Sequence, residues 1–304
     1  MALVHSPARI ALGVAVALGF GLSACGSDSL EEGGKSATES VKSVAKDNSL
    51  ADKVPAALKS KGTLSIGTDA TYAPNEFVGD DGKTITGMDI DLLTAALQKL
   101  GLKATFTNGQ FGTLILGVDN GKFDASVSSF TINDERKKAV NMVSYFNAGT
   151  QWAVKKGNPK KVKADDACGL TVGVQKDTVQ VDDLAARSKK CTQSGKKAIT
   201  SIIEQDQSKV TANLISGKVD AMLADSPVAL YAVQKNTDSI EALGSIYDAA
   251  PYGVVVKKSD TAFAQLLAQA FKSIKDDGTY TSVLKKWGNE TGAINSFEVN
   301  PSVK

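Results

Sequence analysis

The stretch DASVSSFTINDER, residues Asp124 to Arg136, links an apolar run to the charged start of a helix. The run Phe123 to Val127 is typical of a buried strand, and Asn133 is a favourable helix N-cap residue. Three hydroxyl groups and a guanidinium stand where this strand ends: Ser128, Ser129, Thr131 and Arg136. Together they suit a carboxylate ligand, because a planar guanidinium can bind both carboxylate oxygens at once. Alone, the stretch favours a solvated helix start, since most surface charges make no specific contact, but the rest of the chain reverses that preference.

The composition of the chain limits its function. Its 304 residues allow two modest domains or one large one, and 35 basic side chains are balanced by 33 acidic ones. No long basic stripe is present, which argues against nucleic acid as a partner. The single histidine, His5, lies in the first ten residues, so the rest of the sequence has no imidazole for a catalytic triad or a histidine zinc site. Carboxylate or lysine chemistry remains open at this point, but for the whole chain we expect a protein that is not an enzyme and that has no cofactor and no metal.

The N-terminal residues have the pattern of an export signal. Ile10 to Gly21 is apolar but too short to span a membrane, which is typical of a secretory signal peptide. The next residues, LSACG at Leu22 to Gly26, resemble a bacterial lipobox, whose cysteine becomes the lipidated first residue; ordinary cleavage beside a stray cysteine is the alternative. We expect a signal peptide at 1–24, a palmitate-carrying lipid anchor at Cys25 and a flexible tether at 25–53. No later segment is apolar enough to cross a bilayer, so lipid would hold the protein at the outer face of the cytoplasmic membrane.

The two remaining cysteines, Cys168 and Cys191, belong to a chain that we expect to be exported. An oxidising compartment favours a disulfide between them over two free thiols, which is the alternative. The bond would close a loop of about twenty residues and would stabilise the fold by about 3 kcal/mol.

Apolar patterning beyond residue 54 alternates between strand and helix. The predicted elements are strands at 64–68, 103–106 and 123–127 and helices at 88–100 and 113–120. This order predicts an α/β fold with a parallel-type sheet covered by helices.

Two pairs of similar segments indicate that this α/β pattern occurs twice along the chain. NGKFDA at 120–125 is repeated as SGKVDA at 216–221, and the strand and loop at 62–69 have a counterpart at 169–177. The offsets differ, 96 residues for Gly121 to Gly217 and 107 for the second pair, which excludes a solenoid. The chain is therefore predicted to form two lobes of similar topology.

Ligands of α/β sheets bind beyond the carboxyl ends of the strands. Four such ends carry polar or aromatic side chains: Asp69 with Tyr72, then Ser128 to Thr131, then Thr178, and finally Asp225. Two facing lobes would bring these four loops around one cleft. Arg136 with the hydroxyl groups would bind a carboxylate and Asp225 would pair with an ammonium, and together these groups match a free α-amino acid.

A series of motifs resembles one known family. The motifs are GTDATYAPNEF (67–77), GMDIDL (87–92), GKFDASVSSFTINDERKKAV (121–140), VGVQKDTVQ (172–180), GKVDAMLADSPVA (217–229), PYGVVV (251–256) and DDGTYTSVLKKWG (276–288). Their order resembles that of the polar amino acid substrate-binding proteins of ABC importers, which have the type II periplasmic-binding fold. The resemblance extends from about Gly62 to Trp287, nearly the whole folded part.

The resemblance implies an architecture and a set of partners. Lobe 1 would comprise 54–153 and 253–304, and lobe 2 would comprise 154–252. Two crossings, near 153–155 and 252–256, would form a hinge about which the lobes close on the ligand. The implied partners are a membrane permease and its ATPase, and the protein would act as a monomer.

The resemblance also implies roles for individual residues. Arg136 would bind the α-carboxylate bidentately, with Thr131 and the Thr178 region adding donors. Ser129 would contact the α-amino group, largely through its backbone, and Asp225 would form an ion pair with it. The alternative for Asp225 is a purely structural role as the cap of a turn.

Residues around the ligand side chain would decide which amino acid is bound. Tyr72 and Phe111 would flank that side chain, Asp69 would reach its tip, and Phe77 would line the pocket floor. Asp69 would repel glutamate or aspartate, so we expect a basic amino acid or glutamine. The bland alternatives are a turn cap for Asp69 and core packing for Tyr72 and Phe111.

Two other functions remain open from the sequence. The first is a cleft enzyme of the same fold, similar to a dehydratase, for which Glu76 is the candidate acid or base. The second is an amino-acid-sensing lipoprotein that passes its signal to a membrane receptor.

Overall fold

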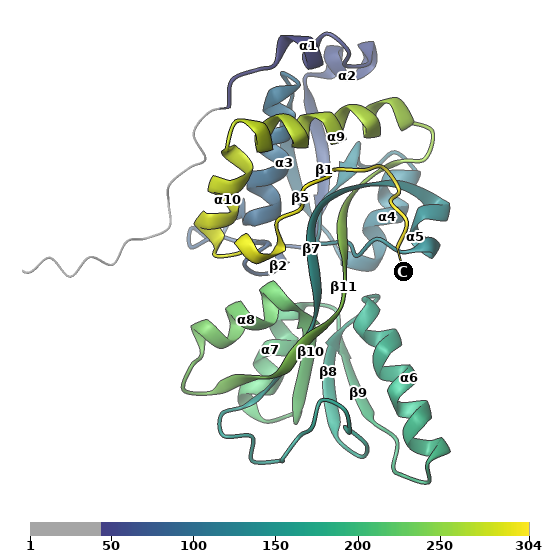
Figure 1. Cartoon of the computed structure of the whole chain (residues 1–304), viewed down its shortest axis with the longest axis vertical. Coiled ribbons are helices and arrows are strands. Elements are labelled where there is room, and N and C mark those ends of the chain that lie inside the picture. The colour runs from purple at the N-terminus through teal and green to yellow at the C-terminus, as the bar shows by residue number, and fades with distance from the viewer. Residues whose placement is uncertain (1–43, 304) are drawn as a thin grey trace, which may run out of the picture. The chain divides into compact units, whose positions relative to one another are not determined.

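The computed structural model describes residues 44–303 (Figure 1). The predicted signal peptide, the predicted lipidation site at Cys25 and most of the predicted tether lie outside the described residues. Within 44–303, no helix combines the length and the apolar character needed to span a membrane.

The centre of the fold is an eight-stranded mixed sheet with strand order β5-β1-β6-β11-β7-β10-β8-β9. Its strands are β1 (Thr63–Thr68), β5 (Lys103–Asn108), β6 (Ala125–Ser126), β7 (Val140–Lys155), β8 (Thr171–Gln175), β9 (Thr200–Glu204), β10 (Ala221–Asp225) and β11 (Ile240–Lys257). At one end β1 runs parallel to β5 and β6, and at the other β8 runs parallel to β9 and β10. The two parallel groups are the sheets of lobe 1 and lobe 2, as the repeated sequence segments predict.

The long antiparallel strands β7 and β11 pass from one lobe to the other (Figure 1). In β7, residues Thr150 to Val154 already pair with β10 of lobe 2. The pairing of β7 with β11 is irregular between Leu243 and Ala250, where bulges let the strands bend. Both crossings therefore lie a few residues before the predicted positions at 153–155 and 252–256.

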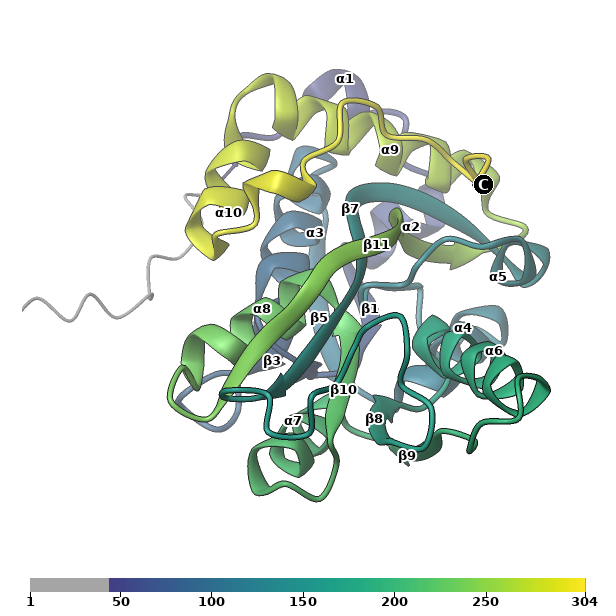
Figure 2. The ribbon, with the colours of Figure 1, turned by 60° about the horizontal axis from the view of Figure 1, so that its bottom comes forward.

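Helices cover both parallel groups. Lobe 1 carries α1 (Asn48–Ala51), α2 (Ala56–Lys61), α3 (Met88–Lys99), α4 (Phe111–Asp119), α5 (Asp134–Ala139), α9 (Thr261–Asp276), α10 (Thr279–Trp287) and the 3-10 turn η1 (Glu290–Gly292). Lobe 2 carries α6 (Val179–Gln193), α7 (Gln207–Ser216) and α8 (Ser226–Lys235). Figure 2 shows α4 and α6, one from each lobe, next to each other. A small antiparallel sheet of β2 (Thr71–Tyr72), β3 (Glu76–Val78) and β4 (Ile85–Thr86) follows β1.

Most predicted elements of lobe 1 agree with these bounds to within about two residues, as expected where apolar periodicity is strong. The strand predicted at 123–127 is shorter, because only Ala125 and Ser126 pair with neighbours on both sides. Asp124 and Val127 extend the contact with β1 by single backbone hydrogen bonds to Ser65 and Gly67.

The prediction of a flexible tether as far as residue 53 is wrong for residues 44–53. Val44 and Leu50 are buried in the core of lobe 1 together with residues of α3 and α9. The side chain of Asp47 caps α1, and its backbone N–H donates to the carbonyl of Lys99 at 2.9 Å. Few apolar side chains anchor this segment, so its polar composition suggested a solvated chain.

A disulfide joins Cys168, just before β8, to Cys191 in the last turn of α6. Their Cα atoms are 5.5 Å apart, which suits an unstrained bond. This is the pairing that the sequence favours over two free thiols. The bond ties α6 to the core of lobe 2.

Candidate functional site

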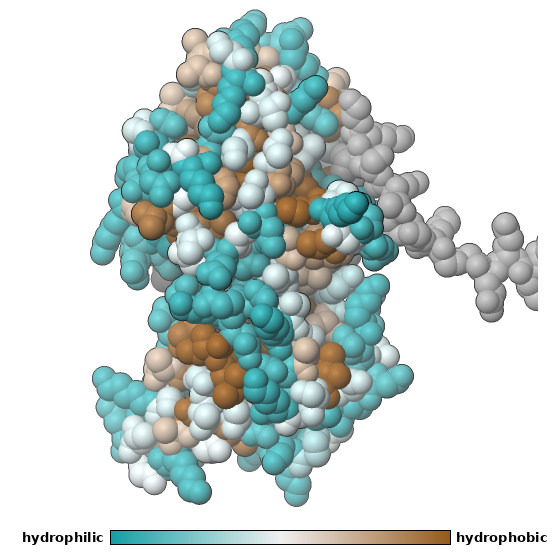
Figure 3. Space-filling model, turned by 180° about the vertical axis from the view of Figure 1, so that it is seen from behind, coloured by the Kyte–Doolittle hydropathy of each residue, from teal (hydrophilic) through white to brown (hydrophobic). Residues whose placement is uncertain are grey.

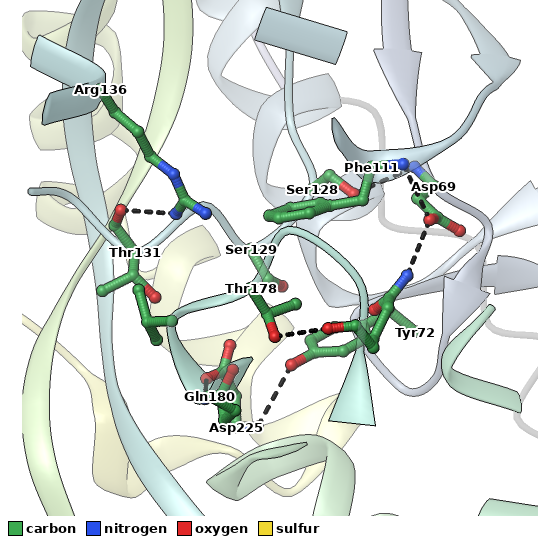
Figure 4. Close-up of a pocket in the computed structure, with 12 residues that line it drawn as sticks. Asp69, Tyr72, Phe111, Ser128, Ser129, Thr131, Arg136, Thr178, Gln180 and Asp225 are labelled. Carbon is green, nitrogen blue, oxygen red and sulfur yellow. Dashed lines mark hydrogen bonds between the residues drawn. The ribbon is translucent and has the colours of Figure 1, made fainter. Parts of the chain in front are cut away.

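The carboxyl ends of β1, β6, β8 and β10 meet at one pocket (Figure 4). Lobe 1 lines it with Asp69, Tyr72, Phe111, Ser128, Ser129, Thr131 and Arg136. Lobe 2 lines it with Gln175, Thr178, Val179, Gln180 and Asp225. Parallel strands place their carboxyl ends at the same edge of a sheet, which is why residues so distant in sequence converge here.

Every predicted ligand-binding residue except Phe77 lines this pocket. The prediction for Phe77 is wrong because successive side chains of a strand point to opposite faces. In β3, Glu76 points into the protein, whereas the half-buried Phe77 ring packs edge-on against Trp287, with centroids 5.8 Å apart.

Arg136 stands at the start of α5, where the side chain of Asn133 caps its backbone N–H at 2.8 Å. Its guanidinium donates to the carbonyls of Thr131 at 2.8 Å and Asp177 at 3.1 Å, and lies 5.2 Å from the centroid of the Phe111 ring. Burial lowers the pKa of Arg136, and the nearby charge of Asp225 opposes that shift. With two of five N–H groups used by backbone carbonyls, the rest can bind an anion.

Asp225 is the buried anionic group of lobe 2. One oxygen accepts from Gln180 Nε2 and the other from the Tyr252 hydroxyl, both at 2.7 Å. Its backbone N–H donates to the Tyr72 hydroxyl of lobe 1 at 3.2 Å. Burial raises the pKa of Asp225, and the hydrogen bonds from Tyr252 and Gln180 oppose that shift. A cation in the pocket would offset the cost of burying this carboxylate.

Asp69 accepts three hydrogen bonds. Thr71 Oγ1 donates to one oxygen at 2.7 Å, and the backbone N–H of Phe111 and Gln175 Nε2 donate to the other at 3.1 and 2.9 Å. Burial raises the pKa of Asp69, and the hydrogen bonds from Thr71 and Phe111 lower it. In this arrangement the side-chain amide of Gln175 occupies the space beside the Asp69 carboxylate.

Sequence reasoning missed two pocket glutamines. Gln175 is the last residue of β8, and Gln180 lies in the first turn of α6, so both flank the predicted Thr178. Both glutamines are part of the motif VGVQKDTVQ, but only the hydroxyl of Thr178 was predicted from it to be a ligand donor.

The two lobes touch across the pocket. Hydrogen bonds between the lobes include Gln175 to Asp69, Arg136 to Asp177, Asp225 to Tyr72, the Tyr252 hydroxyl to Asp225, and the backbone N–H of Gln207 to Thr71 Oγ1. The space between the lining atoms is about 280 Å³ including the open mouth. Within it, the centre of a water-sized sphere can move through only about 10 Å³ without touching the protein. A ligand as large as an amino acid can enter only if the lobes or their side chains move apart.

Glu76, the residue on which the enzyme alternative depends, does not line the pocket. Its carboxyl group is fully buried behind Ser128, whose hydroxyl donates to Glu76 Oε1 at 3.1 Å. In this position a serine separates the carboxyl group from any ligand in the pocket.

Comparison with known proteins identifies relatives along most of the chain. The family model of bacterial extracellular solute-binding proteins, family 3, matches residues 64–290. The arginine-binding protein ArgT of Corynebacterium glutamicum is 34% identical over 249 residues, covering 81% of each chain. The L-cystine-binding protein TcyJ of Escherichia coli is 30% identical over 250 residues, covering 82% of this chain and 89% of TcyJ.

Among solved structures, an ancestral arginine-binding protein bound to arginine superimposes with a TM-score of 0.69 and 34% identity. The match covers 74% of this chain and 98% of that protein. The fold, the converging strand ends and these matches agree with one another, and the chain belongs to family 3 of the bacterial extracellular solute-binding proteins.

Proposed function

We propose that this protein binds a polar amino acid between its lobes and delivers it to the permease and ATPase of an ABC importer. The observation that carries the proposal is the pairing of opposite charges in one pocket, the Arg136 guanidinium from lobe 1 and the Asp225 carboxylate from lobe 2. The charges of a free α-amino acid are complementary to this pair. Lobe closure follows as part of the proposal, because only the closed form brings both groups to the ligand.

The α-carboxylate is placed at Arg136, with donors added by Thr131 and by the start of α6 at Thr178. The α-ammonium is placed between Asp225 and Ser129. Both halves of the ligand are then held by charge-assisted hydrogen bonds, which are stronger than neutral ones.

The side chain of the ligand is proposed to be basic or to end in an amide, as in glutamine. Gln175 presents an amide N–H to Asp69, and a guanidinium, an ammonium or a glutamine amide would supply the same donor. Tyr72 and Phe111 would flank this side chain, and aromatic faces attract cations.

The hollow beside the pocket favours the basic choice. It shares Arg136 and Thr178 with the pocket and is also lined by four acidic residues: Asp119, Glu135, Asp177 and Asp182. Negative potential along an entrance raises the local concentration of cations. Two of the proteins compared above are described as arginine-binding, which supports the same choice.

The proposed setting is the outer face of the cytoplasmic membrane, with a lipid anchor at Cys25 and a monomeric folded part. A monomer is supported because few large hydrophobic residues are exposed within 44–303, and on the face drawn in Figure 3 the hydrophobic patches are interrupted by hydrophilic residues. The exposed residues of this kind within 44–303 are Val78, Leu116, Ile203, Leu230 and Ile246.

A thermal-shift screen of all twenty amino acids tests the proposal. A ligand at 100 times its Kd stabilises the folded state by about 2.7 kcal/mol, which corresponds to a rise in Tm of about 5–10 °C for a chain of this size. We expect arginine, lysine or glutamine to give this shift and glutamate and aspartate to give none. If no amino acid raises Tm, the proposed function is wrong.

A further inference from the structure

Two buried carboxyl groups lie behind the pocket wall that Ser128 and Ser129 form. Glu76 begins β3 and Asp89 is in the first turn of α3, and both side chains are fully buried. Neither lines the pocket. No lysine or arginine within residues 44–303 forms an ion pair with either of them. Two adjacent carboxyl groups with no basic partner need another means of reducing their charge.

The carboxyl groups accept the hydroxyl hydrogens of both serines. Ser128 Oγ donates to Glu76 Oε1 at 3.1 Å, and Ser129 Oγ donates to Asp89 Oδ2 at 3.1 Å. The backbone N–H of Ser129 donates to the same Asp89 oxygen at 2.8 Å, and the Tyr145 hydroxyl is a third donor to it. A hydroxyl has one hydrogen and two lone pairs, and Ser128 Oγ already accepts from the Asp69 N–H and Ser129 Oγ from Asn75 Nδ2, so each oxygen can offer the pocket only its remaining lone pair. That polarity suits an ammonium and disfavours a carboxylate.

The surroundings of the two carboxyl groups favour one proton on this pair. Asp89 Oδ2 has three donors, whereas Asp89 Oδ1 is buried with no N–H or O–H partner among the described residues. Neither carboxyl group has a basic partner among the described residues and the pKa of Glu76 is the more strongly raised, so we assign the proton to Glu76 and the charge to Asp89. Burial and then the charge of Asp89 raise the pKa of Glu76 well above its usual value, and the charge of Asp69 adds to this. The other titratable groups facing the pair are the hydroxyls of Tyr145 and Tyr72, both with raised pKa values because of burial.

The backbone of Ser129 also depends on this pair. Its φ of 50° lies in the left-handed region, which residues other than glycine and asparagine rarely adopt. The N–H bond to Asp89 and the bond from Asn75 Nδ2 to Ser129 Oγ, at 2.9 Å, hold the residue in this conformation.

We propose that Glu76 and Asp89, sharing one proton, are positioning residues that hold Ser128 and Ser129 as hydrogen-bond acceptors for the ammonium group of a bound amino acid. The proposal rests on the proposed function, because it concerns how that ligand is recognised. In this proposal the hydroxyl oxygens of Ser128 and Ser129 act only as acceptors and bind the ammonium group together with Asp225. The ligand carboxylate is then bound by Arg136.

Isosteric variants test the role of the pair by calorimetry with the amino acid that gives the largest thermal shift. In Glu76→Gln the amide replaces the shared proton as donor to Asp89 and its oxygen still accepts from Ser128, so we expect affinity within about twofold of wild type. In Asp89→Asn an amide can donate to Ser129 and turn its hydroxyl toward the pocket, so we expect binding to weaken about three- to tenfold. Glu76→Leu, which removes both the proton and the acceptor, is a second disruptive variant and should weaken binding similarly.

Asp91→Asn is the matched control for these variants. Asp91 lies in the same helix and accepts from Lys286 and from Trp287 Nε1, both at 2.9 Å, but does not line the pocket. We expect it to change Tm and leave the affinity unchanged. The proposal is overturned if Asp89→Asn and Glu76→Leu bind as tightly as Asp91→Asn, or if Glu76→Gln weakens binding as much as they do.

The pH dependence of ligand-free Tm tests the shared proton independently of ligand binding. A carboxyl group with a raised pKa keeps its proton in the folded state while the unfolded chain ionises at about pH 4.3, so stability is lost as pH rises above that value. Wild-type Tm should therefore fall more steeply than Glu76→Gln Tm between about pH 5 and pH 8. If the curves of Tm against pH are parallel for wild type and Glu76→Gln, the assignment of a shared proton is wrong even if an amino acid binds. If the wild-type protein binds no amino acid, the proposed function is wrong instead.

Discussion

Replacing Arg136 with alanine is expected to weaken amino-acid binding by about 30-fold or more, because truncating one side of a buried charge pair costs about 2–5 kcal/mol. The loss has two physical sources. The ligand carboxylate would lose its charge-assisted hydrogen bonds, and Asp225 would lose the positive charge that partly offsets its own burial. Isothermal titration calorimetry with the best ligand from the thermal-shift screen measures the effect.

Arg136→Lys separates charge from geometry. Lysine keeps the positive charge but lacks the planar fork that binds both oxygens of a carboxylate, so its affinity should fall between wild type and Arg136→Ala.

Arg187→Ala is the matched control for the loss of an arginine. Arg187 is also partly buried and pairs with Asp183 at 2.8 Å, and its guanidinium stacks 5.6 Å from the Trp152 ring, but it does not line the pocket. If Arg136→Ala binds as tightly as Arg187→Ala, the carboxylate is held elsewhere and the proposed orientation of the ligand is wrong.

Local chemistry explains why Arg136 could be placed from sequence. The N-cap role of Asn133 and the strand before Ser128 depend on neighbours within a few residues, which the sequence shows directly. The meeting of Arg136 with Asp225 depends on topology, and the repeated NGKFDA and SGKVDA segments supplied that information by indicating a second lobe. The α/β fold and the residues around the pocket were therefore largely predictable.

Contacts that depend on a distant partner were not predictable from local pattern. Gln175 is an ordinary strand residue in sequence, and its bond to Asp69 spans 106 residues. Glu76 was the candidate acid or base for the enzyme alternative, and its direction could not be read from the sequence; strand pairing turns it toward Asp89 and away from the pocket. Val44 shows the same limit for packing, because a single apolar residue in a polar segment gives no periodicity to detect.

Gly112→Ala is expected to weaken amino-acid binding by about 10- to 100-fold, because overpacking a close contact costs about 1–3 kcal/mol. Gly112 is the second residue of α4 in lobe 1 and lies against Asp177 of lobe 2. A Cβ at Gly112 would overlap the Asp177 carboxylate and would lie 2.6 Å from its Cγ and 3.1 Å from its Cβ. Rotating the Asp177 side chain moves its carboxylate away but leaves its Cβ in a tight 3.1 Å contact, so lobe 2 or Asp177 must also shift by a few tenths of an ångström. A shift of Asp177 would also disturb its carbonyl, which accepts from Arg136.

The effect should fall on binding and leave folding intact. Alanine is a better helix former than glycine, by about 1 kcal/mol, and the overlap exists only when the lobes touch. Ligand-free Tm should therefore stay the same or rise while affinity falls. Gly79→Ala is the control, because a Cβ there meets nothing closer than 3.4 Å.

A second substitution in lobe 2 should reverse the loss. Asp177 has a φ of 63°, a conformation that glycine adopts without strain, so Asp177→Gly removes the obstructing side chain and keeps the carbonyl for Arg136. The double variant Gly112→Ala/Asp177→Gly is expected to bind within about threefold of Asp177→Gly alone, since the two changes share one contact and should not be additive. Additive losses would place the cost of Gly112→Ala within lobe 1. Wild-type affinity in Gly112→Ala would mean that the lobes do not approach this closely around the ligand.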